Sequence, residues 1–150
     1  MKKTLTLSSL LLFFIIGCNE KKEPPKPQDD VDAARKFIRS ALDGNYGETK
    51  TYLLPDSINI QYLEVAALNY NKLPGDAKLA YKNSTIQVYE VSPVNDSTTV
   101  VVYSNSYKND HDTLKVVKMK GQWLVDFKYL YQHDMDTMQV KPVAGKDSAR

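Results

Sequence analysis

Cysteine is almost missing from this 150-residue sequence, because Cys18 is its single example. One cysteine excludes an intramolecular disulfide and any metal site built from several cysteines. The sequence also contains no glycine-rich phosphate loop, no nucleophile elbow and no internal repeat. The chain therefore carries no motif of a nucleotide-binding site or of serine-type nucleophilic catalysis.

The first eighteen residues have the layout of a secretory signal. Lys2 and Lys3 precede an apolar run from Leu5 to Ile16, and Gly17-Cys18 follows directly. The run is too short to cross a bilayer, which takes roughly 20 residues. Residues 15–18, Ile-Ile-Gly-Cys, resemble the lipobox of bacterial lipoproteins. That resemblance implies a signal peptide over residues 1–17 and a mature chain that begins at Cys18.

In lipoproteins of this kind the cysteine thiol receives a diacylglycerol and the new N-terminus is often acylated, for example with palmitate. We therefore predict lipidation at Cys18 and a membrane-anchored protein of the bacterial cell envelope. Asn19 follows the cysteine, where some inner-membrane lipoproteins have aspartate. This difference favours the outer membrane over the inner membrane.

A basic surface is also missing once the signal peptide is removed. Loss of Lys2 and Lys3 leaves 18 basic and 18 acidic residues, so the mature chain has no net charge and no basic cluster for nucleic acid. Residues 18–28 are rich in Pro, Lys and Glu, which is typical of an extended tether. We predict one domain over residues 29–137 and a polar tail over residues 138–150.

The domain begins with helical patterns and ends with strand patterns. Asp29 and Asp30 can cap a helix whose apolar residues recur at helical spacing, and Gly44 fits its end. Leu73 to Asp76 has the composition of a turn. The predicted helices cover residues 31–42, 46–54 and 57–71, and the predicted strands cover residues 85–91, 98–107, 113–120 and 122–131. This order favours an α+β fold with helices packed on an antiparallel sheet of about four strands.

Two segments carry a family resemblance. Residues 33–53, AARKFIRSALDGNYGETKTYL, contain an acid-glycine pair between two helices, and residues 118–127, KMKGQWLVDF, form a glycine turn before Trp. Both resemble small bacterial lipoproteins with the nuclear-transport-factor-2-like, cystatin-like fold. The resemblance implies a curved sheet that wraps a long helix into a cone, often with a pocket at the wide end. Many members of this group have no assigned activity.

The last predicted strand separates two faces. Trp123, Val125, Phe127, Tyr129 and Tyr131 alternate along it and should face the helices. The residues expected to line the pocket or core are Phe37, Tyr62, Trp123, Val125, Phe127 and Tyr129. Asp126, the only acid in that strand, should point away from the pocket, which argues against a role as catalytic base.

Other polar groups give weaker signals. The chain has ten tyrosines, which could line a pocket but also suit half-buried sheet surface. His111 and His133 each precede an aspartate, yet their positions suit solvated turns and match no spacing of a known metal site. The sequence therefore predicts no metal, no cofactor and no catalytic residue.

Three functions fit these observations. The first is a non-catalytic module that binds a small ligand or an envelope protein, with the membrane contacted through the lipid on Cys18. The second is an enzyme of the isomerase or hydrolase kind, which requires an acid or histidine inside the cone. The third is a module that forms a homodimer through the sheet face, which the apolar run Val100 to Val102 favours because it puts apolar residues on both faces.

Overall fold

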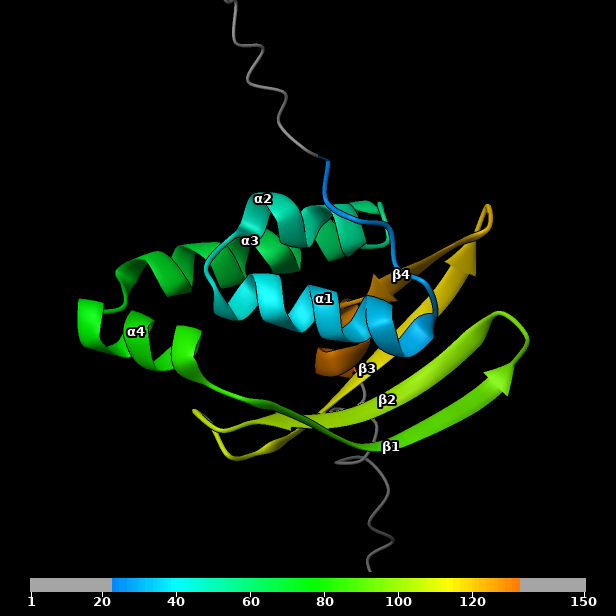
Figure 1. The fold of residues 1–150 in the computed structure, drawn as a ribbon. Helices are drawn as coiled ribbons and strands as arrows, with labels where there is room; N and C mark the ends of the chain where they lie inside the picture. Colours follow the sequence, from blue (N-terminus) through cyan, green and yellow to red (C-terminus); the bar gives the residue numbers. More distant parts are fainter. Residues whose placement is uncertain (1–22, 133–150) are drawn as a thin grey trace, which may run out of the picture.

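The computed structural model describes residues 23–132 as helices packed on one antiparallel sheet (Figure 1). The helical elements are α1 (Asp30–Leu42), α2 (Tyr46–Thr49), the 3-10 helix η1 (Lys50–Tyr52), α3 (Ser57–Lys72) and α4 (Gly75–Asn83). The strands are β1 (Ile86–Asn95), β2 (Thr98–Asn105), β3 (His111–Met119) and β4 (Gln122–Asp126). This arrangement confirms the α+β class and the sheet of four antiparallel strands.

The sheet is a meander in which β1, β2, β3 and β4 lie side by side in chain order. A bulge between Val88 and Glu90 interrupts the pairing of β1 with β2 and so strengthens the local twist. At the other edge Leu53 forms a parallel bridge with Val125, and the Leu54 N–H donates to the Val125 carbonyl over 2.8 Å. This contact ties the segment before α3 to the sheet.

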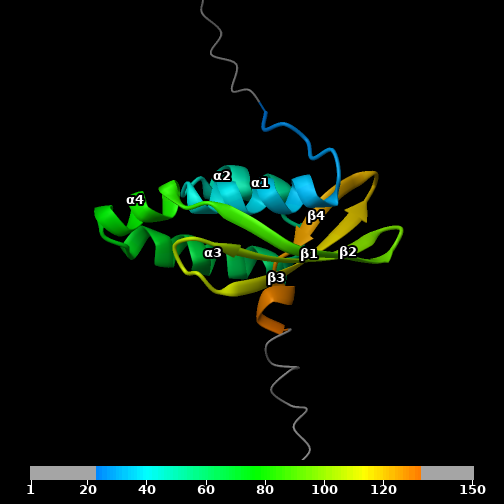
Figure 2. The same ribbon diagram turned by 60° about the horizontal axis from the view of Figure 1, so that its bottom comes forward.

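Helix α1 crosses the sheet and contacts all four strands, as the two views of the ribbon show (Figures 1 and 2). Asp29 caps the helix by accepting the Asp32 N–H over 2.7 Å. The buried face of α1 carries Phe37, whose ring lies 5.2 Å from that of Phe127 after β4. The apolar spacing in the sequence therefore places α1 over the core as expected.

Gly44 follows the end of α1 in a conformation and a space that favour glycine. Its φ of +74° lies in the left-handed region that favours glycine. A Cβ at this position would also overlap the ring of Tyr70 from α3. Gly44 thus allows α3 to pack closely beside the end of α1.

Residues on β2 and β3 alternate between a buried face and a solvent face. Val101, Leu114 and Val116 are fully buried under α1. Val100 and Val102 point to the opposite face, where they are half-buried. The three consecutive valines thus do place apolar side chains on both faces of the sheet.

Helix α4 was not expected from the sequence, where residues 73–76 predict only a turn before the first strand. Pro74 stands at the N-cap of α4, and the helix continues to Asn83. None of its residues is buried, so its sequence has no strong apolar periodicity. The predicted turn is therefore correct as a boundary but is followed by a helix.

The last strand is shorter than predicted. β4 ends at Asp126, and residues 128–132 are helical. The Lys128 N–H donates to the Asn59 side-chain oxygen over 2.7 Å rather than to a neighbouring strand. The alternation predicted for Tyr129 and Tyr131 is therefore wrong, because both residues lie beyond the strand.

The predicted second helix, residues 46–54, is also divided. α2 ends at Thr49, η1 follows, and Leu53 is already extended. The bridge between Leu53 and Val125 requires that extended conformation. The helical prediction is thus right only as far as Tyr52.

Several sequence-based predictions lie outside the described residues. These are the signal peptide over residues 1–17, lipidation at Cys18, His133 and the tail over residues 138–150. Within residues 23–132, no helix combines the length and the apolar character needed to cross a membrane. The same range contains no group of three or more His, Cys, Asp or Glu residues placed to hold a metal ion.

Candidate binding pocket

A pocket of about 240 Å³ lies between the end of α1, the helices α3 and α4, and the sheet. On the sheet it reaches the last residues of β2 and the first residues of β3, at the end opposite the β1–β2 and β3–β4 turns. The lining residues include Phe37, Ile38, Leu42, Tyr46, Leu63, Ala66, Tyr70, Tyr81, Tyr103, Asn105, Lys108, Asp112, Phe127 and Tyr131. The pocket thus joins an apolar wall to a tyrosine-rich polar wall.

The apolar wall is part of the hydrophobic core. Phe37 and Leu42 come from α1, Leu63 comes from α3, and Phe127 follows β4. All four side chains are buried, and they belong to one continuous core cluster. This wall is held in place by the packing of α1 on the sheet.

Aromatic rings follow one another along the side formed by the helices. The Tyr46 and Tyr70 ring centroids are 5.7 Å apart, and Tyr70 lies 6.1 Å from Tyr81. Tyr81 in turn lies 4.0 Å from Tyr107 of the β2–β3 loop. Burial, together with the neighbouring Tyr81 and Tyr70, raises the pKa of Tyr46 to about 12. The raised pKa extends the protonated state of this hydroxyl further into alkaline pH.

Tyr103 and Asp112 form the polar centre of the sheet side. They are opposite residues of β2 and β3, and the Tyr103 hydroxyl donates to the Asp112 carboxylate. Burial first, and then Asp112, raises the pKa of Tyr103 well above its usual range. Burial and the same carboxylate also raise the pKa of Tyr131. The polar wall thus presents protonated hydroxyls around one acidic group.

The predicted lining residues divide between the pocket and the rest of the core. Phe37 and Phe127 line the pocket, whereas Val125 is fully buried in the core. Tyr62 stacks on Tyr131 with centroids 4.5 Å apart and supports the wall without lining it. Trp123 packs against the core at the opposite end of β4.

Tyr129 is not a pocket residue. The strand ends before it, and the Lys115 ammonium group lies 4.9 Å from the centre of its ring. Lys115 belongs to the face of the sheet that α1 does not cover, because its neighbours Leu114 and Val116 face the core. The interpretation of Tyr129 as a lining residue is therefore corrected by the early end of β4.

Asp112 lines the pocket but is not among the residues predicted from the sequence, where the pair His111-Asp112 suits a solvated turn. His111 instead begins β3 and packs edge-on against Tyr89, with centroids 4.3 Å apart. Strand alternation then turns Asp112 to the same face as the buried Leu114. The alternation of buried residues along β3, followed back from Leu114 to Asp112, is the sequence signal that identifies Asp112 as a residue of the core face.

Asp126 lies on the other face of β4 and does not line the pocket. It is nonetheless buried, and it accepts a hydrogen bond from the Asn59 amide over 3.0 Å. Lys115 and Lys128 form ion pairs with it at 2.8 Å and 3.3 Å. Burial opposes its ionisation, but the hydrogen bonds from Lys115 and Asn59 outweigh burial and lower its pKa.

The charged cluster also fixes the start of α3. Asp56 caps α3 and pairs with Lys128 over 2.9 Å. The Lys128 ammonium and the Asn59 backbone N–H lower the pKa of Asp56 to about 2. α3, which carries part of the pocket wall, is therefore joined to the end of β4 by Asp56, Asn59, Asp126 and Lys128.

The comparisons with known proteins concern this domain. The chain is similar to an NTF-2-like protein of unknown function from Shewanella oneidensis MR-1. The match covers 63% of this chain and 89% of the other, with 13% sequence identity and a TM-score of 0.48. No protein-family model and no curated protein matches the sequence.

Proposed function

We propose that this chain is a lipid-anchored envelope protein whose domain binds a small ligand in the pocket. The observation that carries the proposal is the pocket's two-sided lining, with Phe37, Leu63 and Phe127 on one side and Tyr103 and Asp112 on the other. Such a site suits a compact molecule with an apolar body and a polar end. Its volume of about 240 Å³ lies below the range of about 300–1,000 Å³ typical of drug-sized ligands, so the ligand is small.

The polar end of the ligand would meet fixed hydrogen-bonding groups. The Tyr46 hydroxyl can donate a hydrogen bond, whereas the Tyr103 hydroxyl already donates to Asp112 and so offers a ligand its oxygen lone pairs. Asn105 and Lys108 add groups from the β2–β3 end of the sheet. Fixed hydrogen-bonding groups of this kind orient a ligand and disfavour analogues without its polar group.

A variant that fills the pocket tests this proposal. Ala66 lines the pocket from α3, whereas its neighbour Val65 is exposed to solvent. We expect Ala66→Phe to abolish the co-purification of a small molecule, because the added ring occupies the cavity. Val65→Phe, which adds a ring on the outside of the same helix, should retain it. Solvent extraction and mass spectrometry of both purified proteins give the readout.

Retention of the same molecule by Ala66→Phe would contradict binding in this pocket. Loss of the molecule from both variants would also contradict it, because the external ring leaves the cavity unchanged. Circular dichroism and thermal unfolding of the two variants establish that each is folded before the extracts are compared.

The lipid anchor is proposed from the sequence alone. A charged start, a short apolar run and Gly17-Cys18 support processing to a lipidated cysteine. By mass spectrometry we expect the N-terminal peptide of the envelope-purified protein to begin at Cys18 and to carry a diacylglycerol there, and Cys18→Ser to carry no acyl group. An unmodified Cys18 on an uncut chain would contradict the anchor.

An enzyme is the second candidate, and Asp112 favours it. A carboxylate is one of the side chains that act in acid–base catalysis, and Asp112 is the acidic residue among the described lining residues. If the protein transforms its ligand, Asp112→Asn should co-purify with a molecule that differs covalently from the one held by the unaltered protein. Identical molecules in both proteins favour binding without turnover.

A further inference from the structure

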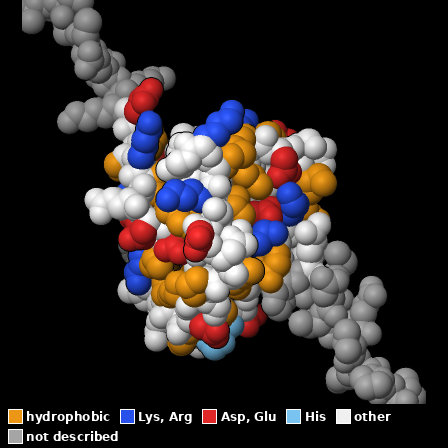
Figure 3. Space-filling view, turned by 90° about the vertical axis from the view of Figure 1, so that its right-hand side faces the viewer, with side chains coloured by type: hydrophobic (Ala, Val, Ile, Leu, Met, Phe, Trp, Pro, Cys, Tyr) orange, Lys and Arg blue, Asp and Glu red, His pale blue; other side chains and the backbone are white. Residues whose placement is uncertain are grey.

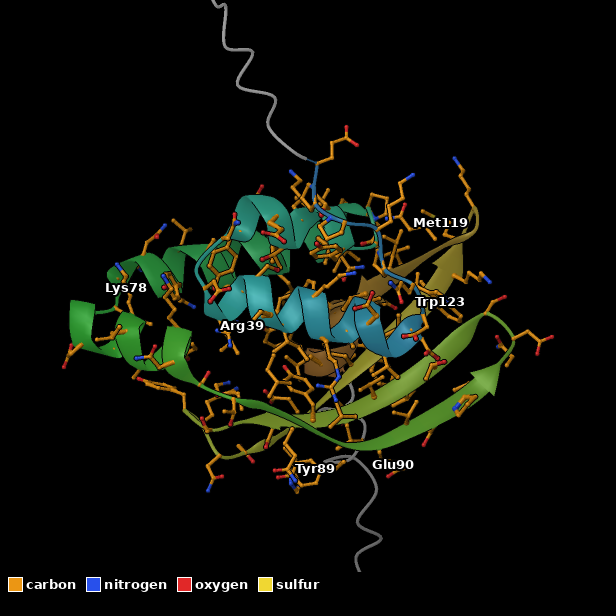
Figure 4. All side chains as sticks on the ribbon, in the orientation of Figure 1. Arg39, Lys78, Tyr89, Glu90, Met119 and Trp123 are labelled. Carbon is orange, nitrogen blue, oxygen red and sulfur yellow. The ribbon has the colours of Figure 1, made fainter. Side chains whose placement is uncertain are left out.

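The two hairpin turns at the end of the sheet opposite the pocket expose apolar side chains. Val94 is 63% exposed near the β1–β2 turn, and Met119 is 36% exposed at the β3–β4 turn. Trp123 lies beside Met119 at this end, while Lys78 of α4 lies at the other end (Figure 4). We call the group Val94, Lys118, Met119, Lys120 and Trp123 the hairpin end.

The two turns form one surface. The Lys118 N–H donates to the Ser97 carbonyl over 2.8 Å, which joins the β3–β4 hairpin to the β1–β2 turn. The Lys118 ammonium group lies 5.4 Å from the centre of the Trp123 ring. The space-filling view from this side shows hydrophobic side chains with charged groups around them (Figure 3).

The tether leads to the same part of the molecule. A depression is lined by Glu23, Pro24 and Lys26 of the tether together with Thr51, Tyr52 and Gln122, the residue before Trp123. The Lys26 carbonyl accepts a hydrogen bond from the Lys36 ammonium group over 3.3 Å. The Gln28 N–H donates a hydrogen bond to the Asp32 carboxylate over 2.9 Å. These bonds hold the tether against the first turns of α1.

The distance from the tether to the proposed lipid is short. Five residue steps separate Glu23 from Cys18, and a fully extended chain of that length spans at most about 18 Å. If Cys18 carries acyl chains, the bilayer surface must therefore lie within about 18 Å of Glu23. Glu23 shares its depression with Gln122, which lies between Met119 and Trp123 in the β3–β4 hairpin, so the described start of the tether is next to an exposed apolar surface.

We propose that the hairpin end docks on the lipid bilayer that holds the anchor. This inference rests on the proposed lipidation of Cys18. A partly exposed tryptophan suits the boundary between headgroups and acyl chains, and Val94 and Met119 supply apolar groups that can enter it. Lys118 and Lys120 are exposed on either side of Met119 and can reach lipid phosphates.

Docking in this way sets the direction of the pocket. The hairpin end contains the start of β2 and the end of β3, whereas the pocket lies at the end of β2 and the start of β3. With the hairpin end on the membrane, the pocket faces away from the bilayer. Its ligand then reaches it from the aqueous phase rather than from the lipid.

Trp123 reports on this contact, because it is the only tryptophan in the sequence. The protein purified from the envelope is reconstituted into vesicles of phosphatidylcholine and phosphatidylglycerol, with or without acyl chains brominated near the headgroup. We expect the bromine to quench the Trp123 emission by roughly half, because interfacial groups insert about 5–10 Å into the headgroup boundary. The double variant Val94→Asp with Met119→Asp should lose this quenching.

A matched control uses the opposite end of the molecule. Leu68 on α3 and Leu79 on α4 are 59% and 58% exposed, so Leu68→Asp with Leu79→Asp makes an equal chemical change. This control should keep the quenching. Vesicle flotation of each protein separates the two proposals, because flotation measures anchoring whether or not the domain docks.

Each outcome decides between the proposals. Flotation without quenching of Trp123 overturns docking while the anchor stands. Failure of the unaltered protein to float contradicts both the anchor and the docking. Equal loss of quenching in both double variants also overturns docking at the hairpin end, because the contact would then not depend on Val94 and Met119.

Discussion

Phe37→Ala should lower the unfolding free energy by about 3–5 kcal/mol, the usual cost of removing a buried phenylalanine ring. Phe37 is 3% exposed and packs on Phe127 at the centre of the core. Small domains are stable by about 5–15 kcal/mol, so this loss is a large part of the total. Urea denaturation followed by far-UV circular dichroism measures it.

Phe37→Leu is the matched variant, because it keeps most of the apolar volume. It should cost less than about 1.5 kcal/mol, since hydrophobic replacements of similar volume are tolerated best. A cost for Phe37→Ala below that of Phe37→Leu would contradict the placement of this ring in the core. Phe37→Ala also enlarges the pocket and should weaken ligand retention beyond its effect on folding.

Asp126→Ala should be the second most damaging change, with a loss of about 3 kcal/mol. The Asp126 side chain is 5% exposed, and its removal leaves Lys115 and Lys128 without their partner at β4. Removal of one partner of a buried ion pair usually costs about 3–5 kcal/mol. We expect the low end of this range because the side chains of Lys115 and Lys128 both retain some contact with water. Chemical denaturation at neutral pH gives the readout.

Asp126→Asn separates charge from hydrogen bonding. The amide can retain a hydrogen bond with Asn59 but loses the attraction of the two lysines, so its cost should be smaller than that of Asp126→Ala. The pKa of Asp126 is lower in the folded protein than its ordinary value of 3.8, so its charge stabilises the fold above about pH 4. The difference between the unaltered protein and Asp126→Asn should shrink as the pH falls below that value.

A constant difference between the two proteins down to acidic pH would contradict the charged cluster as the source of this stability. Equal stability of Asp126→Ala and the unaltered protein at neutral pH would contradict it as well. In that case the start of α3 would be held to the end of β4 by the Asp56–Lys128 pair, the bond from Lys128 to Asn59 and the bridge of Leu53 to Val125.

Local patterns in the sequence were sufficient where an element packs one face on the core. α1 follows from the cap at Asp29 and the apolar spacing through Phe37, and β2 and β3 follow from their alternation. α4 could not be found in this way, because it buries no residue. The end of β4 depends on a bond from Lys128 to Asn59, which lie 69 positions apart.

The pocket was harder to predict because its groups come from distant segments. Tyr103 and Asp112 meet only through the pairing of β2 with β3, and Tyr70 reaches the wall only because Gly44 leaves room for it. Phe37 and Phe127 were found because they are core residues as well as lining residues. Asp126 was correctly placed away from the pocket, but its burial depends on Lys115 and Lys128, which no local pattern indicates.

Native mass spectrometry of residues 19–150, purified gently from a bacterial envelope and free of the lipid, tests the central claim most directly. Binding in the pocket predicts a discrete added mass at one ligand per chain, which mild activation in the gas phase removes. A bare chain, whether monomer or dimer, would contradict a resident pocket ligand. The same spectrum would then show whether copies of the chain associate, as the half-buried Val100 and Val102 on the open sheet face would allow.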